Sequence, residues 1–346
     1  MLKRILAVLI LALTLTACAG PASNPRPTTT PAPSTGGGLT VHYIDVGQAD
    51  CALLECDGEY ILIDGGNVED SSLVVSYLQQ QGVEELEAVV CSHAHEDHVG
   101  GLPGVLAVYP TDGVYAPTRT YSSNCFDDFV YYTDQQGLSI TIPAVGDTIT
   151  FGSATAEVLG PVQQYADTNN TSLILMVSYG DTRFLFTGDM EIAAETDLLD
   201  SGADIKADVL KVGHHGSDTS TGYRFLYEVN PAYAVISVGE DNSYGHPCEV
   251  PLSRLEDAGC TIYRTDKLGS ILARSDGKDI TFTWGKTNAA PDTGDTAPIT
   301  YIGNTKSKKF HIPGCSSLPA EQNRTTFSTY DEAVEAGYTP CGNCMG

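Results

Sequence analysis

Four candidate metal ligands lie within six consecutive residues of the chain, and this cluster limits the possible fold more than any other feature. His93, His95, Asp97 and His98 directly follow the apolar residues 88–91. A short apolar run that ends in polar residues is typical of a buried strand, and a rigid strand fixes the side chains that follow it. The spacing suits two neighbouring cations, with His93 and His95 on one and Asp97 and His98 on the other. A solvated polar loop is the alternative interpretation.

The composition limits the partners of such a site. The 346 residues carry a formal net charge of −26, and the whole acidic excess lies between residues 39 and 298. A strongly acidic surface opposes unaided binding to nucleic acid or to anionic lipid. Bound cations would reverse the field locally. Imidazole and carboxylate ligands in this combination favour zinc, and manganese or iron would also fit.

Strand and helix patterns extend from residue 39 to about Trp284. Residues 39–44, 51–54 and 60–64 are predicted strands, and residues 73–80 are a predicted helix. This mixture predicts an α/β (α+β) domain over residues 39–286. A polar linker with Pro and Gly follows at residues 287–298, and residues 299–346 form a compact tail.

The first 38 residues predict export. Lys3 and Arg4 precede an apolar run at residues 5–15, which is too short to span a bilayer comfortably. Residues 15–18 read Leu-Thr-Ala-Cys and resemble the lipobox of bacterial lipoproteins. That resemblance implies that residues 1–18 are a signal peptide, that Cys18 is acylated, and that the protein is anchored to the membrane outside the cytoplasm. A plain signal peptide or an uncleaved anchor is the alternative. Residues 19–38, rich in Pro, Thr, Ser and Gly, predict a disordered tether.

The ligand cluster and three further motifs resemble the metallo-β-lactamase superfamily. These motifs are residues 61–66 with Asp64, residues 184–189 with Asp189, and residues 212–217 with His214 and His215. The resemblance covers about residues 39–286 and implies a four-layer αββα sandwich with the ligand loop at one edge. It also implies that Asp64 supports the ligand loop, that Asp189 bridges the two cations, and that His215 completes the second cation site.

A narrower resemblance is to the hydrolase domain of the ComEC competence proteins. It rests on residues 45–50, 169–172, 244–247 and 264–266. Asn169 or Asn170 stands where the third motif of the superfamily has a histidine, which leaves the first cation with fewer protein ligands. The paired His214 and His215 are also similar to those of the phosphorylcholine esterases of the same superfamily.

These resemblances imply hydrolysis of a phosphodiester by water that two zinc ions, or two manganese ions, activate. His214 is expected to contact a phosphoryl oxygen or to protonate the leaving group. His246 could do the same, or it could be a structural residue of a turn. Glu96 is expected to point outward from the ligand loop.

The tail carries a four-ligand zinc pattern, formed by His311, Cys315, Cys341 and Cys344. So short a tail has a small core, so we expect a structural zinc ion to hold it. Disulfides are the alternative in an exported protein, although three cysteines cannot all pair with one another. A helix is predicted between a capping box at Thr329 and Glu332 and an end at Gly337.

The tail as a whole resembles the zinc domain of the Ada DNA-repair methyltransferase, with His311 where that family has a cysteine. The resemblance implies a structural or DNA-contacting zinc module. Six other cysteines are predicted to be buried thiols or disulfides, with Cys91 in the core: Cys51, Cys56, Cys91, Cys125, Cys248 and Cys260.

Three functions therefore remain open. The first is a phosphodiesterase or nuclease that acts on DNA outside the membrane. The second is a hydrolase of cell-envelope or small-molecule phosphoesters, such as a phosphorylcholine or teichoic-acid esterase, which the negative charge favours. The third is a non-catalytic DNA-binding lipoprotein.

Overall fold

The computed structural model of the chain describes residues 37–286, 291–293, 300–312, 315–328, 330–342 and 344. The predicted signal peptide with Cys18, nearly all of the predicted tether, most of the predicted linker, and Thr329 of the predicted capping box lie outside the described residues. Within the described ranges, no helix has both the length and the apolar character needed to cross a membrane.

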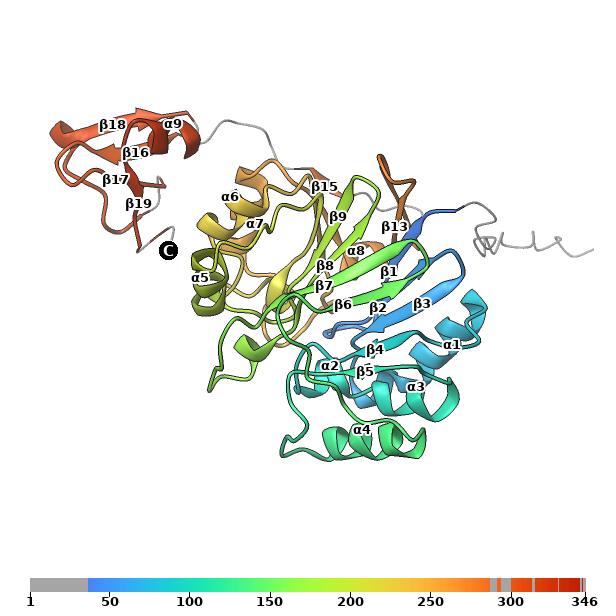
Figure 1. Cartoon of the computed structure of the whole chain (residues 1–346). Helices are drawn as coiled ribbons and strands as arrows, with labels where there is room; N and C mark the ends of the chain where they lie inside the picture. The colour runs from blue at the N-terminus through green and yellow to red at the C-terminus, as the bar shows by residue number, and fades with distance from the viewer. Residues whose placement is uncertain are drawn as a thin grey trace, which may run out of the picture. The chain divides into compact units, whose positions relative to one another are not determined.

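Two β-sheets form the centre of the large domain (Figure 1). The first contains, in spatial order, β14 (Ile280–Trp284), β13 (Ile271–Ser275), β1 (Leu39–Tyr43), β2 (Ala52–Cys56), β3 (Glu59–Ile63), β4 (Ala88–Val90) and β5 (Val114–Tyr115). The second contains β15 (Asp292–Thr293), β12 (Thr261–Arg264), β11 (Tyr233–Ile236), β10 (Val209–Lys211), β9 (Thr182–Phe186), β8 (Ile174–Tyr179), β7 (Ala154–Gly160) and β6 (Thr148–Phe151).

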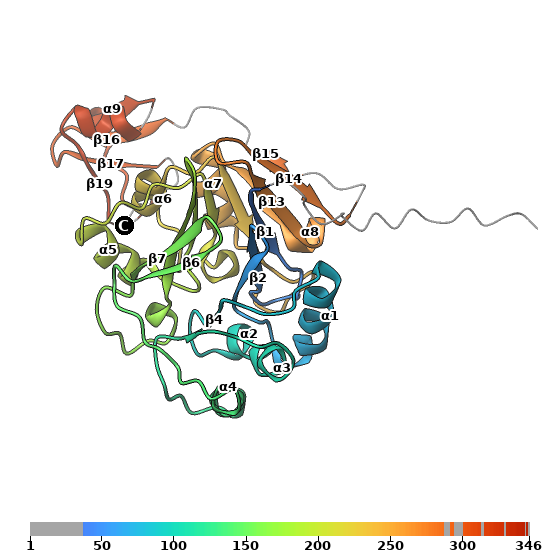
Figure 2. The same cartoon turned by 45° about the vertical axis from the view of Figure 1, so that its right-hand side comes forward.

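Helices cover the outer faces of both sheets (Figure 2). The first sheet carries α1 (Ser71–Gln81), α2 (Glu96–Val99), α3 (Leu102–Val108) and α4 (Asn124–Gln135), and the second carries α5 (Ile192–Asp200), α6 (Tyr223–Val229) and α7 (Glu249–Asp257). Shorter helices are η1 (Val68–Asp70), η2 (Asn169–Thr171), η3 (Gly213–Gly216) and α8 (Thr265–Leu268). Helix, sheet, sheet and helix layers make the four-layer αββα sandwich, and the expected fold is confirmed.

The layers follow from strands that are apolar on both faces. In β2, Leu54 packs into the core between the sheets, whereas Leu53 packs against the helices outside. In β8, Leu175 belongs to the core between the sheets and Met176 to the outer core. Successive side chains of a strand point to opposite faces, so a nearly continuous apolar run buries both.

The predicted strands and helix are present with ends shifted by one or two residues, and the end of β2 shows why. β2 continues beyond Leu54 to Cys56 and pairs with β3 across a tight turn at Asp57 and Gly58. Both turn residues have positive φ, 54° and 87°, which matches the twist of a two-residue hairpin. The Asp-Gly pair was the available signal for this longer hairpin.

Parallel strands bring the candidate ligands to one edge of the sandwich. β3 is parallel to β4, and β9, β10 and β11 are parallel to one another. Asp64 and His93 come after the first pair, and Asp189 and His214 come after β9 and β10. Because the carboxyl ends of parallel strands meet at the same edge, residues far apart in sequence become neighbours there.

The tail forms its own small sheet, in the order β18 (Arg324–Phe327), β16 (Tyr301–Asn304), β17 (Lys309–His311) and β19 (Thr339–Pro340). The short helices η4 (Glu321–Asn323) and α9 (Tyr330–Glu335) accompany it. Phe310 and Phe327 are among its buried aromatic side chains. The predicted helix is present, and Gly337 follows its end with a φ of 79°.

Gly101 allows the ligand loop to lie against the end of β3. A Cβ atom there would meet the carbonyl oxygen of Gly65 at 2.0 Å. We expect Gly101→Ala to lower the free energy of unfolding by about 1–3 kcal/mol, because the two loops must separate. Gly285→Ala is the control, since its nearest atoms lie 3.9 Å away and a change of at most about 0.5 kcal/mol is expected. Urea denaturation measures both, and equal stabilities would contradict the close packing.

Candidate metal centre

Asp64 holds the ligand loop in place. Its Oδ1 accepts a hydrogen bond of 2.6 Å from the backbone N–H of Ser92, and its Oδ2 accepts one of 2.7 Å from the Ser92 hydroxyl. The same Oδ2 lies 2.8 Å from Nδ1 of His98. Asp64 has a φ of 59°, an uncommon conformation for a residue with a side chain. This carboxylate therefore orients a candidate ligand rather than pointing at the centre itself.

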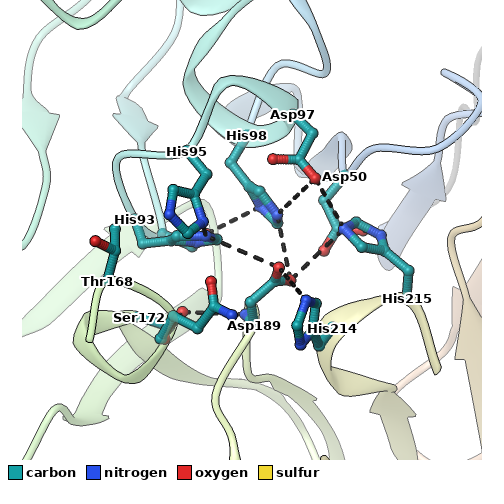
Figure 3. A network of polar contacts seen from close by, with 12 residues as sticks. Asp50, His93, His95, Asp97, His98, Thr168, Ser172, Asp189, His214 and His215 are labelled. Atoms are coloured by element: carbon teal, nitrogen blue, oxygen red, sulfur yellow. Dashed lines mark hydrogen bonds and ion pairs between the residues drawn. The ribbon is translucent and has the colours of Figure 1, made fainter. Parts of the chain in front are cut away.

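Asp189 lies at the centre of the site, and its two oxygens face different histidines (Figure 3). Oδ1 is 3.2 Å from Nε2 of His98 and 3.7 Å from Nε2 of His215. Oδ2 is 3.9 Å from Nε2 of His93 and 3.7 Å from Nε2 of His214. A carboxylate placed in this way can bridge two cations, as the resemblance implied.

The residues of the second cation site form a compact group. Four candidate metal-binding atoms lie within 4.8 Å of one another, one each from Asp97, His98, Asp189 and His215. Oδ1 of Asp189, Nε2 of His98 and Nε2 of His215 are buried and have no hydrogen-bond partner among the described residues. Buried polar atoms without partners are costly. A divalent cation between them would satisfy all three, so the residues fit the metal that the fold implies.

The carboxylates of the site favour positive charge on the neighbouring histidines. Burial lowers the pKa of His98, but the carboxylates of Asp189 and Asp64 outweigh it and hold this pKa well above its usual value. Burial also lowers the pKa of His215, and Asp189 with Asp50 raises it to about 10. A cation held by His98 and His215 would supply this charge in place of the protons.

Asp50 and Lys211 support His215 from behind. Nδ1 of His215 lies 3.0 Å from the carbonyl oxygen of Ser237 and 3.3 Å from Oδ1 of Asp50. Nζ of Lys211 is 2.8 Å from Oδ2 of Asp50, and both side chains are buried. No role was predicted for this pair from the sequence. Asp50 lies in the motif at residues 45–50, but nothing in the sequence connects it with Lys211.

His93 and His95 lie side by side at the first cation site, with Nε2 of His93 3.0 Å from Nδ1 of His95. Asn169 and Asn170, which replace the missing histidine, form hydrogen bonds to Glu191. The side-chain oxygen of Asn170 accepts a hydrogen bond of 3.1 Å from the backbone N–H of Glu191, and Asn169 donates one of 3.3 Å to the Glu191 carboxylate. Both asparagines therefore hold the loop that follows Asp189.

Two histidines lie where the site opens to solvent. The side chain of His214 is 22% exposed, and its ring centroid is 5.7 Å from that of His246. The ring of Tyr244, 70% exposed, stacks on His246 at 5.7 Å. Glu96 is exposed.

An open hollow of about 600 Å³ lies beside Tyr121, whose ring centroid is 6.2 Å from that of His95. Its walls are Thr120, Tyr121, Ser122, Ser123, Asn124 and Asp127. These residues were not predicted from the sequence, because a loop rich in hydroxyl groups carries no recognisable motif.

The tail brings its four predicted ligands together. Donor atoms of His311, Cys315, Cys341 and Cys344 lie within 4.8 Å of one another. Buried Nε2 of His311 has no hydrogen-bond partner among the described residues. Every cysteine in the described part of the chain is a free thiol, so the disulfide alternative is wrong there. Cys91 is buried in the core, as predicted.

We expect Cys341→Ser to remove one metal equivalent from the full chain and to loosen the tail, because binding energy at a structural zinc site is also folding energy. Cys248→Ser is the matched control, since this thiol is half-buried and outside the cluster. Elemental analysis after dialysis measures the metal content. The same content in both variants would contradict a zinc site in the tail.

Known proteins share both parts of the chain. A model of the metallo-beta-lactamase superfamily matches residues 44–240, and a model of the metal binding domain of Ada matches residues 296–345. ComE operon protein 3 of Bacillus subtilis is 30% identical over 70% of this chain and 34% of its own length. Competence protein ComA of Neisseria gonorrhoeae is 32% identical over 66% of this chain and 31% of its own. The chain thus spans about a third of these relatives.

Among solved structures, the metallo-beta-lactamase fold protein YhfI from Bacillus subtilis is 12% identical, with a TM-score of 0.49. The match covers 69% of this chain and 100% of that one.

Proposed function

This chain belongs to the metallo-β-lactamase superfamily and ends in a metal-binding domain like that of Ada, and on this premise we propose that it is an exported, lipid-anchored phosphodiesterase. Its relation to competence proteins makes it a metal-dependent hydrolase of this fold. The observation that carries the finer proposal is the position of Asp189, with one oxygen toward His98 and His215 and the other toward His93.

The residues around Asp189 would hold two divalent cations, which would supply an activated water molecule and stabilise charge on the reacting oxygens. The chain contributes a proton donor beside them. Gln48 accepts a hydrogen bond of 3.1 Å from Gly239, so its amide nitrogen faces Nδ1 of His246 at 3.3 Å. With Nδ1 as the acceptor, the proton of neutral His246 is on Nε2. His246 can therefore donate this proton to a leaving oxygen.

The surroundings favour a nucleic acid or a nucleotide as the substrate. Tyr121 and the exposed Tyr244 offer aromatic faces on which bases can stack, and such stacking does not depend on sequence. The similarity to competence proteins and to Ada supports the same proposal.

A second candidate is hydrolysis of small phosphoesters from the cell envelope. The hollow beside Tyr121 has no Lys or Arg among its lining residues, and it includes Asp127. A long polyanion would find few contacts there to neutralise its phosphates. A phosphorylcholine or teichoic-acid ester needs fewer of them.

A substrate panel on the metal-loaded full chain separates these candidates. Linear DNA, a nitrophenyl phosphodiester and a phosphorylcholine ester are compared under the same conditions. Cleavage of DNA that weakens as salt rises would support the nuclease, because salt screens phosphate contacts. If no phosphodiester is cleaved, the non-catalytic DNA-binding lipoprotein becomes the better explanation.

Asp189→Ala should abolish nearly all turnover, because it removes a ligand from both cations at once. We expect a loss larger than the roughly 10²–10⁴-fold that a proton-transferring group supplies. Glu96→Gln is the control, since Glu96 is exposed on the same loop, and its activity should stay near that of the wild type. Steady-state rates on the nitrophenyl phosphodiester measure both variants. Substantial activity in Asp189→Ala would exclude a bridging role.

Membrane attachment is proposed to depend on Cys18, in the lipobox-like residues 15–18. Cys18→Ala should release the protein from the membrane fraction or leave its precursor unprocessed. Fractionation of cells, with labelling by a radioactive fatty acid, measures both effects. Unchanged labelling and attachment would exclude lipidation at this residue.

A further inference from the structure

The first cation site lacks a ligand that the superfamily usually supplies. The asparagines in place of the third-motif histidine bind Glu191 instead. We propose that His214 replaces this ligand, so that His93, His95, His214 and Oδ2 of Asp189 hold the first cation. The second cation is then left to Asp97, His98, His215 and Oδ1 of Asp189. The proposal rests on the two-cation centre of the proposed function, but not on the identity of its substrate.

The contacts of Asp189 divide the two consecutive histidines between the two sites. Nε2 of His215 is 3.7 Å from Oδ1, whereas Nε2 of His214 is 3.7 Å from Oδ2. Oδ2 is also the oxygen that faces His93. Two ligand atoms at about 2.0–2.2 Å from one zinc ion can be at most about 4.2 Å apart. The distance from His214 to Oδ2 is within this limit.

The orientation of the His214 ring matches that of the other candidate ligands. A histidine that binds a metal usually holds its second nitrogen against a fixed hydrogen-bond partner. Nδ1 of His98 contacts Asp64, and Nδ1 of His215 contacts the Ser237 carbonyl oxygen. Nδ1 of His214 likewise lies 3.2 Å from the Thr219 hydroxyl and 3.5 Å from the Glu191 carboxylate. In all three rings Nε2 faces Asp189 (Figure 3).

The neighbouring His246 shows the opposite arrangement. Its Nδ1 accepts a hydrogen bond from Gln48, which places the proton on Nε2. A protonated nitrogen has no lone pair for a metal. His246 therefore remains a proton donor, whereas His214, which the sequence analysis also expected to act on the substrate, becomes a ligand.

The backbone explains how two consecutive side chains reach one centre. His214 and His215 have φ values of 50° and 52°, in the left-handed region. In an extended strand these two side chains would point to opposite faces. This conformation is costly for a residue with a side chain, and it persists only where the surrounding structure enforces it. Here it directs both imidazoles toward Asp189.

Counting metal ions in the full chain tests the proposal. The wild type, loaded with zinc and dialysed, should hold three equivalents. One belongs to the tail and one to the second site, where candidate ligand atoms form compact groups, and one belongs to the proposed first site. His214→Ala and His214→Asn should each hold two. Asn tolerates the left-handed conformation but is too short to replace the imidazole, so it preserves the turn. Chelator titration should show first-site affinity reduced at least about tenfold, because even supporting residues cost about 10–100-fold.

His246→Ala is the matched control and should keep all three equivalents. Circular dichroism confirms that each variant is folded. Full metal content with wild-type affinity in folded His214→Asn would overturn the proposal and return His214 to a role at the substrate. Loss of both active-site ions would overturn it as well, since the proposal places His214 at one site only. Metal content needs no substrate, so failure of the proposed phosphodiesterase activity would be detected separately.

Discussion

Asp189 has to be buried, carry a negative charge and face four imidazoles at once, and the arrangement of the large domain depends on these conditions. Its carboxylate is 2% exposed, and such a charge is costly to bury unless cations balance it. The four Nε2 atoms lie 3.2 to 3.9 Å from its oxygens. Divalent cations between these atoms would satisfy both the charge and the unpaired nitrogens. We therefore expect divalent cations to complete this charged, buried site.

Two further buried carboxylates hold the histidines around Asp189 in position. Asp64 accepts hydrogen bonds from Ser92 and orients His98, whereas Asp50 orients His215. Asp50 is neutralised by the buried Lys211 at 2.8 Å. Buried ion pairs add little net stability, but removing one partner leaves an uncompensated charge. We interpret the pair as a way to fix His215 without drawing Asp50 into the metal site.

Most of the fold was readable from the sequence, because its strands are short, apolar and separated by clear turns. The ligand run at His93 to His98 and the tail pattern at His311 to Cys344 were equally visible, since their spacing is local. The predicted strand at residues 51–54 ended two residues too early, because Glu55 interrupts the apolar pattern. The hollow beside Tyr121 and the partnership of Asp50 with Lys211 were missed, since neither has a local sequence pattern.

The sequence by itself determined which residue types meet a metal, because His93, Asp97 and His98 are neighbours on one loop. The layer order was implied by the resemblance to the metallo-β-lactamase superfamily, and it agrees with strands that are apolar on both faces. Only the tertiary structure decided which oxygen of Asp189 faces which histidine, and so how His214 and His215 are divided. That division depends on parallel strands β9 and β10 meeting β4 at one edge, and on a left-handed backbone at two consecutive residues. Neither condition can be predicted from the spacing of the residues, since both arise from contacts between segments far apart in the chain.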